Sequence, residues 1–147
     1  FPDILTDKQY VDAAALNFVR NPWDFDVVVT ENMFGDILSD LGAGLIGGMG
    51  MAPSADIGDN IAVFQPSHGT APDIMGKGKS NPTGMILSVV LLLKWLAAQG
   101  WSDNYFKAAN LLDQAVCRAY ADGKLVPYEA GGNAGTKDIL NRVLNYL

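Results

Sequence analysis

The stretch TENMFGDILSD, residues 30–40, carries two aspartates four positions apart, directly after a short apolar run. If this stretch is helical, Asp36 and Asp40 share one face, because residues four apart are neighbours on a helix surface. Like charges at that spacing repel each other by roughly a few tenths of a kcal/mol on a solvated helix. Two interpretations follow: the pair lies on a solvated surface, or a cation lies between the carboxylates.

The overall composition is that of a globular protein of about one domain length. The chain has 147 residues, of which 49% are hydrophobic and 18% charged. Its net charge of -6 and its scattered basic residues argue against a nucleic-acid surface. The most apolar run, Met85 to Leu93, is too short to span a membrane. The start at Phe1, with neither a Met nor a basic signal region, predicts further residues upstream.

The chain contains a single cysteine, Cys117, within a helical-looking segment. One cysteine cannot form an internal disulfide, so we expect a reducing compartment such as the cytoplasm. A nucleophilic role is open, but we favour a small, buried hydrophobic residue, since the one histidine is not nearby in sequence.

Helical patterns outnumber strand patterns along the chain. The capping-box pattern Thr6-Asp7-Lys8-Gln9 predicts the start of a helix that ends near Asn21. Strands are expected at residues 25–29 and 61–64. Further helices are expected at residues 34–46, 82–98 with Asn81 as the cap, 102–121 and 136–147. Two short strands separated by a helix cannot form a sheet with both faces covered, so partner strands are expected outside this chain.

Two features are candidates for chemistry. Asp36 and Asp40 supply the hard oxygen ligands that Mg²⁺ or Mn²⁺ prefers. The loop at residues 65–80 contains glycines that allow close approach of a ligand, and Asp73 could accept hydrogen bonds from a ribose diol. An irregular surface loop stiffened by prolines is the alternative interpretation. His68 is interpreted as a packing or hydrogen-bonding residue rather than a base.

These residues together resemble a known family. The segment NMFGDILSDL at residues 32–41, followed by HGTAPDI at residues 68–74, then GKG at 76–78 and Asn81-Pro82, is similar to the β-decarboxylating dehydrogenases. That family includes 3-isopropylmalate, isocitrate, homoisocitrate and tartrate/D-malate dehydrogenases. The resemblance extends from Tyr10-Val11-Asp12 to the C-terminus. It implies an α/β fold of the isocitrate/isopropylmalate dehydrogenase type, unrelated to the Rossmann fold, of which this chain matches the C-terminal portion.

The resemblance implies a metal-dependent oxidation of a small 2-hydroxy acid, with hydride passing to a nicotinamide cofactor and the β-carboxylate leaving as CO₂. Asp36 and Asp40 match two metal-site aspartates of one subunit. Asp12 matches a third, which the family supplies from the neighbouring subunit, so a homodimer is implied. A bound Mg²⁺ or Mn²⁺ would then compensate the paired charges of Asp36 and Asp40.

The second motif matches the family's adenosine-binding loop. The matching positions are His68, Gly69, Thr70, Ala71, Pro72, Asp73, Ile74 and Asn81. NAD-linked members place an aspartate at the position of Asp73, and its charge would repel a 2′-phosphate, so NAD is favoured. Gln65 departs from the Glu of many members, which leaves open how the nicotinamide-side loop is held.

The family's catalytic tyrosine and lysine and its substrate-binding arginines have no counterpart here, so we expect the segment alone to be inactive. Residues 1–46 would end the inserted substrate and dimerisation domain, and residues 47–147 would form the C-terminal half of the large cofactor-binding domain. The rival hypothesis is a non-catalytic nucleotide-binding or assembly subunit. The sequence does not distinguish among the malate-type substrates.

Overall fold

The computed structural model describes residues 2–147, which divide into two compact units. The first unit ends at Leu45 and the second begins at Ile46. Which part of an enzyme each unit forms stays a prediction.

The first unit is helical. It contains α1 (Val11–Arg20), the 3-10 turn η1 (Pro22–Asp24) and α2 (Asn32–Leu45). The two helices pack against each other, and Ala14 of α1 and Leu38 of α2 are buried. The rings of Phe18 and Phe25 meet edge to face, with centroids 4.5 Å apart, which ties the segment after η1 back to α1.

The predicted start of the first helix is wrong. Helix α1 begins at Val11, and the side chains of the expected capping box bind elsewhere. The carboxylate of Asp7 accepts from the backbone N–H of Lys8 at 2.7 Å, and the side chain of Gln9 accepts from Asn17 at 3.2 Å. A capping pattern has an effect only if the residues after it turn into helix at once, and these do not.

The predicted buried strand at residues 25–29 is also absent from the described structure. Val27 is 85% exposed and Val29 is 92% exposed. An apolar run becomes a strand only when a neighbouring strand takes up its backbone hydrogen bonds. Within residues 2–147, no strand pairs with this run.

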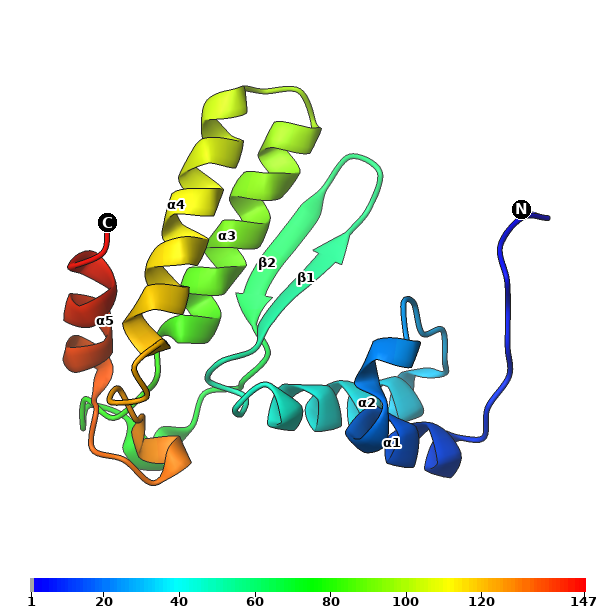
Figure 1. Cartoon of the computed structure of the whole chain (residues 1–147), viewed down its shortest axis with the longest axis horizontal. Helices are drawn as coiled ribbons and strands as arrows, with labels where there is room; N and C mark the ends of the chain where they lie inside the picture. The colour runs from blue at the N-terminus through cyan, green and yellow to red at the C-terminus, as the bar shows by residue number, and fades with distance from the viewer. Residues whose placement is uncertain (1) are drawn as a thin grey trace. The chain divides into compact units, whose positions relative to one another are not determined.

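In the second unit, a central helix packs against a hairpin on one side and a second helix on the other, and a third helix packs on the second. Its elements are β1 (Pro53–Ile57), β2 (Ala62–Pro66), η2 (Pro72–Ile74), α3 (Thr83–Ala98), α4 (Asp103–Tyr120), η3 (Tyr128–Ala130) and α5 (Thr136–Leu144). The strands pair antiparallel, with Pro53 opposite Pro66 and Ile57 opposite Ala62. Figure 1 shows α3 between the hairpin and α4, with α5 on the far side of α4.

Helix α3 packs against the hairpin on one side and against α4 on the other. These two contacts explain why the run from Met85 to Leu93 is apolar around most of the helix circumference. A buried cluster of Ala115, Val116 and Ala119 from α4 with Val143 from α5 forms the core, and Ile86 and Leu87 of α3 pack against it. Among residues 2–147, no helix is both long and apolar enough to cross a membrane.

The other predicted helices of this unit are confirmed, with shifts of a few residues at their ends. Ser102 caps α4 by accepting from the backbone N–H of Asn104 at 3.2 Å. Strand β1 was not expected, and the predicted burial of Cys117 is wrong, since this residue is exposed on α4.

Candidate functional site

The two candidate metal-binding carboxylates lie one turn apart on α2. Asp36 and Asp40 are both exposed, and the hydroxyl of Ser39 between them donates to the carbonyl oxygen of Asp36 at 3.1 Å. Within residues 2–147, no basic side chain forms an ion pair with either carboxylate. The described chain therefore leaves their repulsion uncompensated, and the pair is free to bind a cation.

The third candidate ligand, Asp12, lies in the first turn of α1. It is exposed, and its carboxylate accepts from the backbone N–H of Ala13 at 2.8 Å. The part of the chain that the structure describes brings no three His, Cys, Asp or Glu side chains together as a metal-binding group. Asp12 thus does not complete the pair within one chain. Two carboxylates nevertheless fit Mg²⁺ or Mn²⁺, because Mg²⁺ commonly takes one or two protein carboxylates and completes its shell with water and substrate oxygens.

The candidate cofactor loop begins where β2 ends. The backbone N–H of Ser67 donates to the carbonyl oxygen of Ala52 at 3.0 Å, which fixes this start beside β1. The loop then makes a 3-10 turn, η2, with Pro72 in its first position and Asp73 exposed. Ala71, just before the turn, has φ +40°, a left-handed conformation that a residue with a Cβ rarely adopts. Such strain is concentrated at ligand-binding segments.

His68 is half-buried at the start of this loop. Its Nδ1 lies 2.9 Å from the carbonyl oxygen of Gly69, and donates to that oxygen when Nδ1 carries the proton. The contact is local and leaves the other ring nitrogen to other partners. This geometry suits a residue that shapes the loop.

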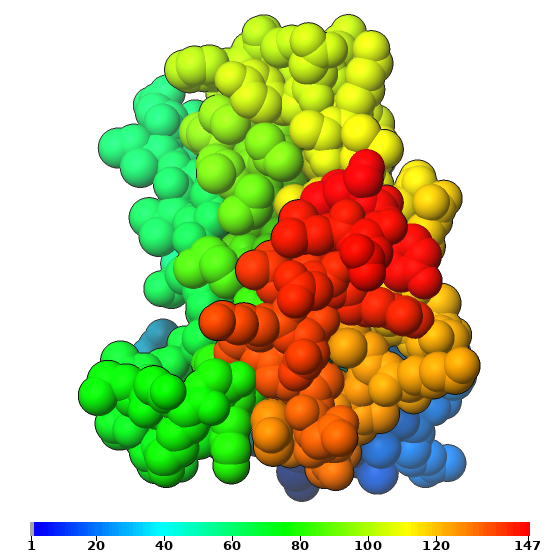
Figure 2. All heavy atoms as spheres, turned by 90° about the vertical axis from the view of Figure 1, so that its left-hand side faces the viewer, coloured from blue at the N-terminus to red at the C-terminus, as the bar shows by residue number. Residues whose placement is uncertain are grey.

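A pocket of about 620 Å³ lies between the loop and the start of α5. One wall is formed by Thr70, Ala71 and Ile74, and the other by the first residues of α5, namely Thr136, Lys137 and Asp138. In Figure 2 the loop (green) lies beside the segment leading into α5 (orange to red). The structure thus gathers three of the predicted cofactor-binding residues around one pocket, while His68, Gly69, Pro72, Asp73 and Asn81 do not line it.

The α5 wall of the pocket is bonded to the loop. The backbone N–H of Thr136 donates to Gly78 at 2.8 Å, and the Thr136 hydroxyl donates to the carbonyl oxygen of Ser80. Gly135 permits this approach, because a Cβ there would lie 2.5 Å from the carbonyl oxygen of Gly78. Sequence reasoning missed this wall. The run GGNAG at residues 131–135, just before a helix, was the signal available for a close backbone approach.

Asn81 is buried where the loop joins α3, with 6% of its surface exposed. Its side-chain oxygen accepts from the backbone N–H of Thr83 at 3.0 Å. Its amide nitrogen donates to the carboxylate of Glu129 at 2.8 Å and lies 3.3 Å from the sulfur of Met51. The side chain of Asn81 is therefore already occupied by protein partners.

A second polar contact lies beside Asn81. The hydroxyls of Thr83 and Tyr120 are 2.8 Å apart and share a hydrogen bond, and Thr83 is fully buried. Burial of the Tyr120 hydroxyl raises its pKa, an effect that the bond from Thr83 only partly offsets. Tyr120 is therefore neutral at ordinary pH and ties α4 to the start of α3.

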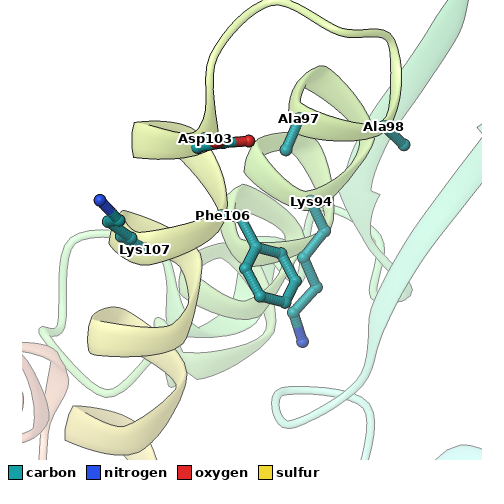
Figure 3. Close-up of a pocket in the computed structure, with 6 residues that line it drawn as sticks. All are labelled: Lys94, Ala97, Ala98, Asp103, Phe106 and Lys107. Atoms are coloured by element: carbon teal, nitrogen blue, oxygen red, sulfur yellow. The ribbon is translucent and has the colours of Figure 1, made fainter.

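Another pocket, of about 550 Å³, lies between the end of α3 and the start of α4. Figure 3 shows Phe106 and Lys94 side by side in it, with Lys107 pointing away. Lys94 also forms an ion pair with Asp113 at 3.2 Å. The residues predicted from the sequence to form a site do not line this pocket.

Comparison with known proteins gives related sequences and related folds. A 3-isopropylmalate dehydrogenase of Sulfurisphaera tokodaii is 47% identical, over 95% of this chain and 42% of its own length. The crystal structure of an isocitrate dehydrogenase from Methylococcus capsulatus is 40% identical with a TM-score of 0.83, over 99% of this chain and 42% of the other. A β-decarboxylating dehydrogenase structure from Thermococcus kodakarensis is also 40% identical with a TM-score of 0.75, over 92% of this chain and 38% of the other.

This chain thus spans about two fifths of the length of these relatives. The family model described as isocitrate/isopropylmalate dehydrogenase matches residues 1–143. The expected α/β fold type is confirmed by the matching structures, and the relatives cited above are named as dehydrogenases. The chain belongs to the isocitrate/isopropylmalate dehydrogenase family.

Proposed function

We propose that the native polypeptide containing this chain is an NAD- and divalent-metal-dependent dehydrogenase that oxidises and decarboxylates a malate-type 2-hydroxy acid. The observation that carries this proposal is the presence, in a member of this family, of an unpaired aspartate pair on α2 and a pocket at the predicted adenosine-binding loop. The name of the cited relative supports a 3-isopropylmalate-like substrate, and a tartrate/malate-like substrate rests on the motif resemblance.

Asp36 and Asp40 would hold Mg²⁺ or Mn²⁺, with Asp12 of a second copy as a further ligand. When bound, the cation supplies Lewis-acid stabilisation of the substrate's hydroxyl and carboxylate oxygens. The exposure of all three carboxylates and their failure to gather within one chain support a site completed by another copy. A homodimer is therefore part of this proposal.

The loop from His68 to Ile74, together with Asn81, would hold the adenosine part of NAD. When bound, NAD supplies the hydride acceptor. The exposed carboxylate of Asp73 would accept hydrogen bonds from the ribose hydroxyls and would repel the 2′-phosphate of NADP. The glycines at 76 and 78, both at positive φ, let the backbone turn tightly beside the pocket.

The proposal assigns the first unit to a substrate and dimerisation domain and the second to a cofactor-binding domain. The proton-transferring groups of the reaction would come from residues without a counterpart in this chain. A single cysteine fits a reducing compartment, which supports placing the protein in the cytoplasm.

Replacement of one candidate metal ligand tests this function. In the native polypeptide, Asp36→Asn should lower kcat by about 100-fold or more and raise the Mg²⁺ concentration needed for half-maximal rate, because a neutral amide binds a hard cation poorly. Asp103→Asn, an exposed aspartate on α4, is the matched control and should leave both values unchanged. Near-normal activity and metal dependence in Asp36→Asn would rule out the metal assignment.

A further inference from the structure

We propose that Glu129 is a positioning residue for the cofactor-binding loop, and that it acts through the side-chain amide of Asn81. This inference rests on the proposed NAD site at that loop. Glu129 lies in η3, 48 positions after Asn81, and is not among the residues that line the pocket. Its effect on the cofactor is therefore indirect.

The amide of Asn81 has two strong partners, and each sets the same orientation. Its oxygen faces the backbone N–H of Thr83, which needs an acceptor, and its nitrogen faces the Glu129 carboxylate, which needs a donor. The sulfur of Met51 lies near the nitrogen, and a thioether accepts only weakly. The Tyr120 hydroxyl also interacts with Asn81, but it shares a hydrogen bond with Thr83. Because Asn81 is buried, loss of the Glu129 carboxylate would leave its N–H groups poorly bonded.

Gly50 leaves space for the carboxylate of Glu129 beside Asn81. A Cβ at residue 50 would lie 2.5 Å and 2.6 Å from the two Glu129 carboxylate oxygens, and 2.9 Å from the Cβ of Asn81. Only glycine at position 50 is compatible with this approach. Glu129 thus joins the segment before β1 to the end of the cofactor loop.

The loop residues just before Asn81 are also held by contacts with the segment from η3 to α5. Lys79 places its ammonium group 4.9 Å above the ring centre of Tyr128, and Thr136 bonds to Gly78 and Ser80. Residues 78–81 are therefore fixed, one after another, to the segment that runs from η3 to α5. Glu129 adds a side-chain acceptor to this series, and its hydrogen bond to Asn81 restricts the end of the loop.

Substitutions at Glu129 separate a positioning role from a general stabilising role. In the native polypeptide, Glu129→Ala should raise the KM for NAD about 10-fold while kcat stays within about twofold, since ground-state binding is lost and the chemistry is not. Glu129→Gln should keep the KM for NAD near the wild-type value, because the amide oxygen of Gln accepts the same hydrogen bond. Asp122→Asn, which weakens an ion pair with Arg142 in the same unit, is the control and should leave the KM unchanged.

Amide hydrogen exchange measures how well the loop backbone is protected when no NAD is present. Exchange at residues 74–80 should be faster in Glu129→Ala than in wild type and unchanged in Glu129→Gln. If Glu129→Ala does not fold, Glu129→Asp, whose carboxylate is one methylene shorter, should give a smaller change of the same sign. Unchanged loop exchange, or equal effects of Ala and Gln, would overturn the positioning role. A wild-type polypeptide that does not use NAD would instead refute the proposed function, and the exchange result would still decide the role of Glu129.

Discussion

Among single residues, Asp73 carries the proposed choice between NAD and NADP. It lies exposed in η2, beside the strained Ala71, where its carboxylate can face a ribose. Asp73→Asn removes the charge and keeps the shape. We expect the KM for NAD to rise about 10-fold and discrimination against NADP to fall by at least as much, since repulsion of the 2′-phosphate is lost.

Steady-state kinetics with both cofactors measures this effect. Asp59→Asn, an exposed aspartate between the hairpin strands, should leave both KM values unchanged. An unaltered ratio of NAD to NADP efficiency in Asp73→Asn would show that another residue selects the cofactor.

Tyr120 gives a prediction about stability and pH. Its pKa is raised in the folded state above the ordinary value of 10.0, chiefly by burial, so the folded protein holds the phenolic proton more tightly than the unfolded chain. The stability linked to this proton is complete below pH 10.0 and declines as the pH rises from there through the folded pKa. Tyr120→Phe should remove this decline. It should also cost about 1–2 kcal/mol at neutral pH, because the buried Thr83 hydroxyl loses its partner.

Urea unfolding of wild type and Tyr120→Phe at pH values from neutral to alkaline measures both effects. Tyr146→Phe, which removes a hydroxyl from an exposed side chain, is the control for the substitution itself. Parallel pH profiles in wild type and Tyr120→Phe would contradict the raised pKa.

The sequence could propose some candidate site residues because they are contiguous. Asp36 and Asp40 share one short motif, and His68 to Ile74 share another. Glu129 and Thr136 could not be identified in this way. They reach the loop through hydrogen bonds across 48 and 56 positions, and a single sequence contains no pattern for such pairs.

For helices and strands, the same contrast appears between local and distant interactions. The helices at Thr83–Ala98 and Asp103–Tyr120 were predicted almost to the residue, because a helix satisfies its hydrogen bonds within its own segment. The apolar run at residues 25–29 has no strand to pair with among residues 2–147. Strand β1 shows the reverse case. Its sequence PSADI has a low strand propensity, and it forms a strand because it pairs with β2.

The junction between the loop and α5 gives a prediction for these elements. Gly135→Ala would place a Cβ against the carbonyl oxygen of Gly78, so the loop must move away from α5. We expect unfolding free energy to fall by about 1–3 kcal/mol. The KM for NAD should rise because one wall of the pocket is displaced.

Thermal unfolding and NAD titration check this prediction. Gly44→Ala is the control, since a Cβ on that exposed glycine of α2 meets nothing within 4 Å. It should be neutral or stabilise the protein by up to about 1 kcal/mol. Equal behaviour of the two variants would show that the loop is not held against α5.

At the scale of the whole molecule, the candidate metal ligands and the candidate cofactor loop belong to different units. The chain spans about two fifths of the length of its relatives, and residues 2–147 bring no three His, Cys, Asp or Glu side chains together as a metal-binding group. Composition could predict a globular protein, and the two motifs could predict the family. Neither composition nor motifs could predict the oligomeric assembly from the residues alone, because assembly depends on which surfaces of two copies meet.

The most direct measurement is the amount of reduced NAD and of CO₂ that the native polypeptide produces from malate-type 2-hydroxy acids, with Mg²⁺ or Mn²⁺ present. The proposed function predicts equal amounts of both products from at least one such acid, loss of both on chelation, and recovery when the cation is restored. Binding of NAD without either product from any of these acids would contradict it, and would favour a non-catalytic nucleotide-binding or assembly subunit.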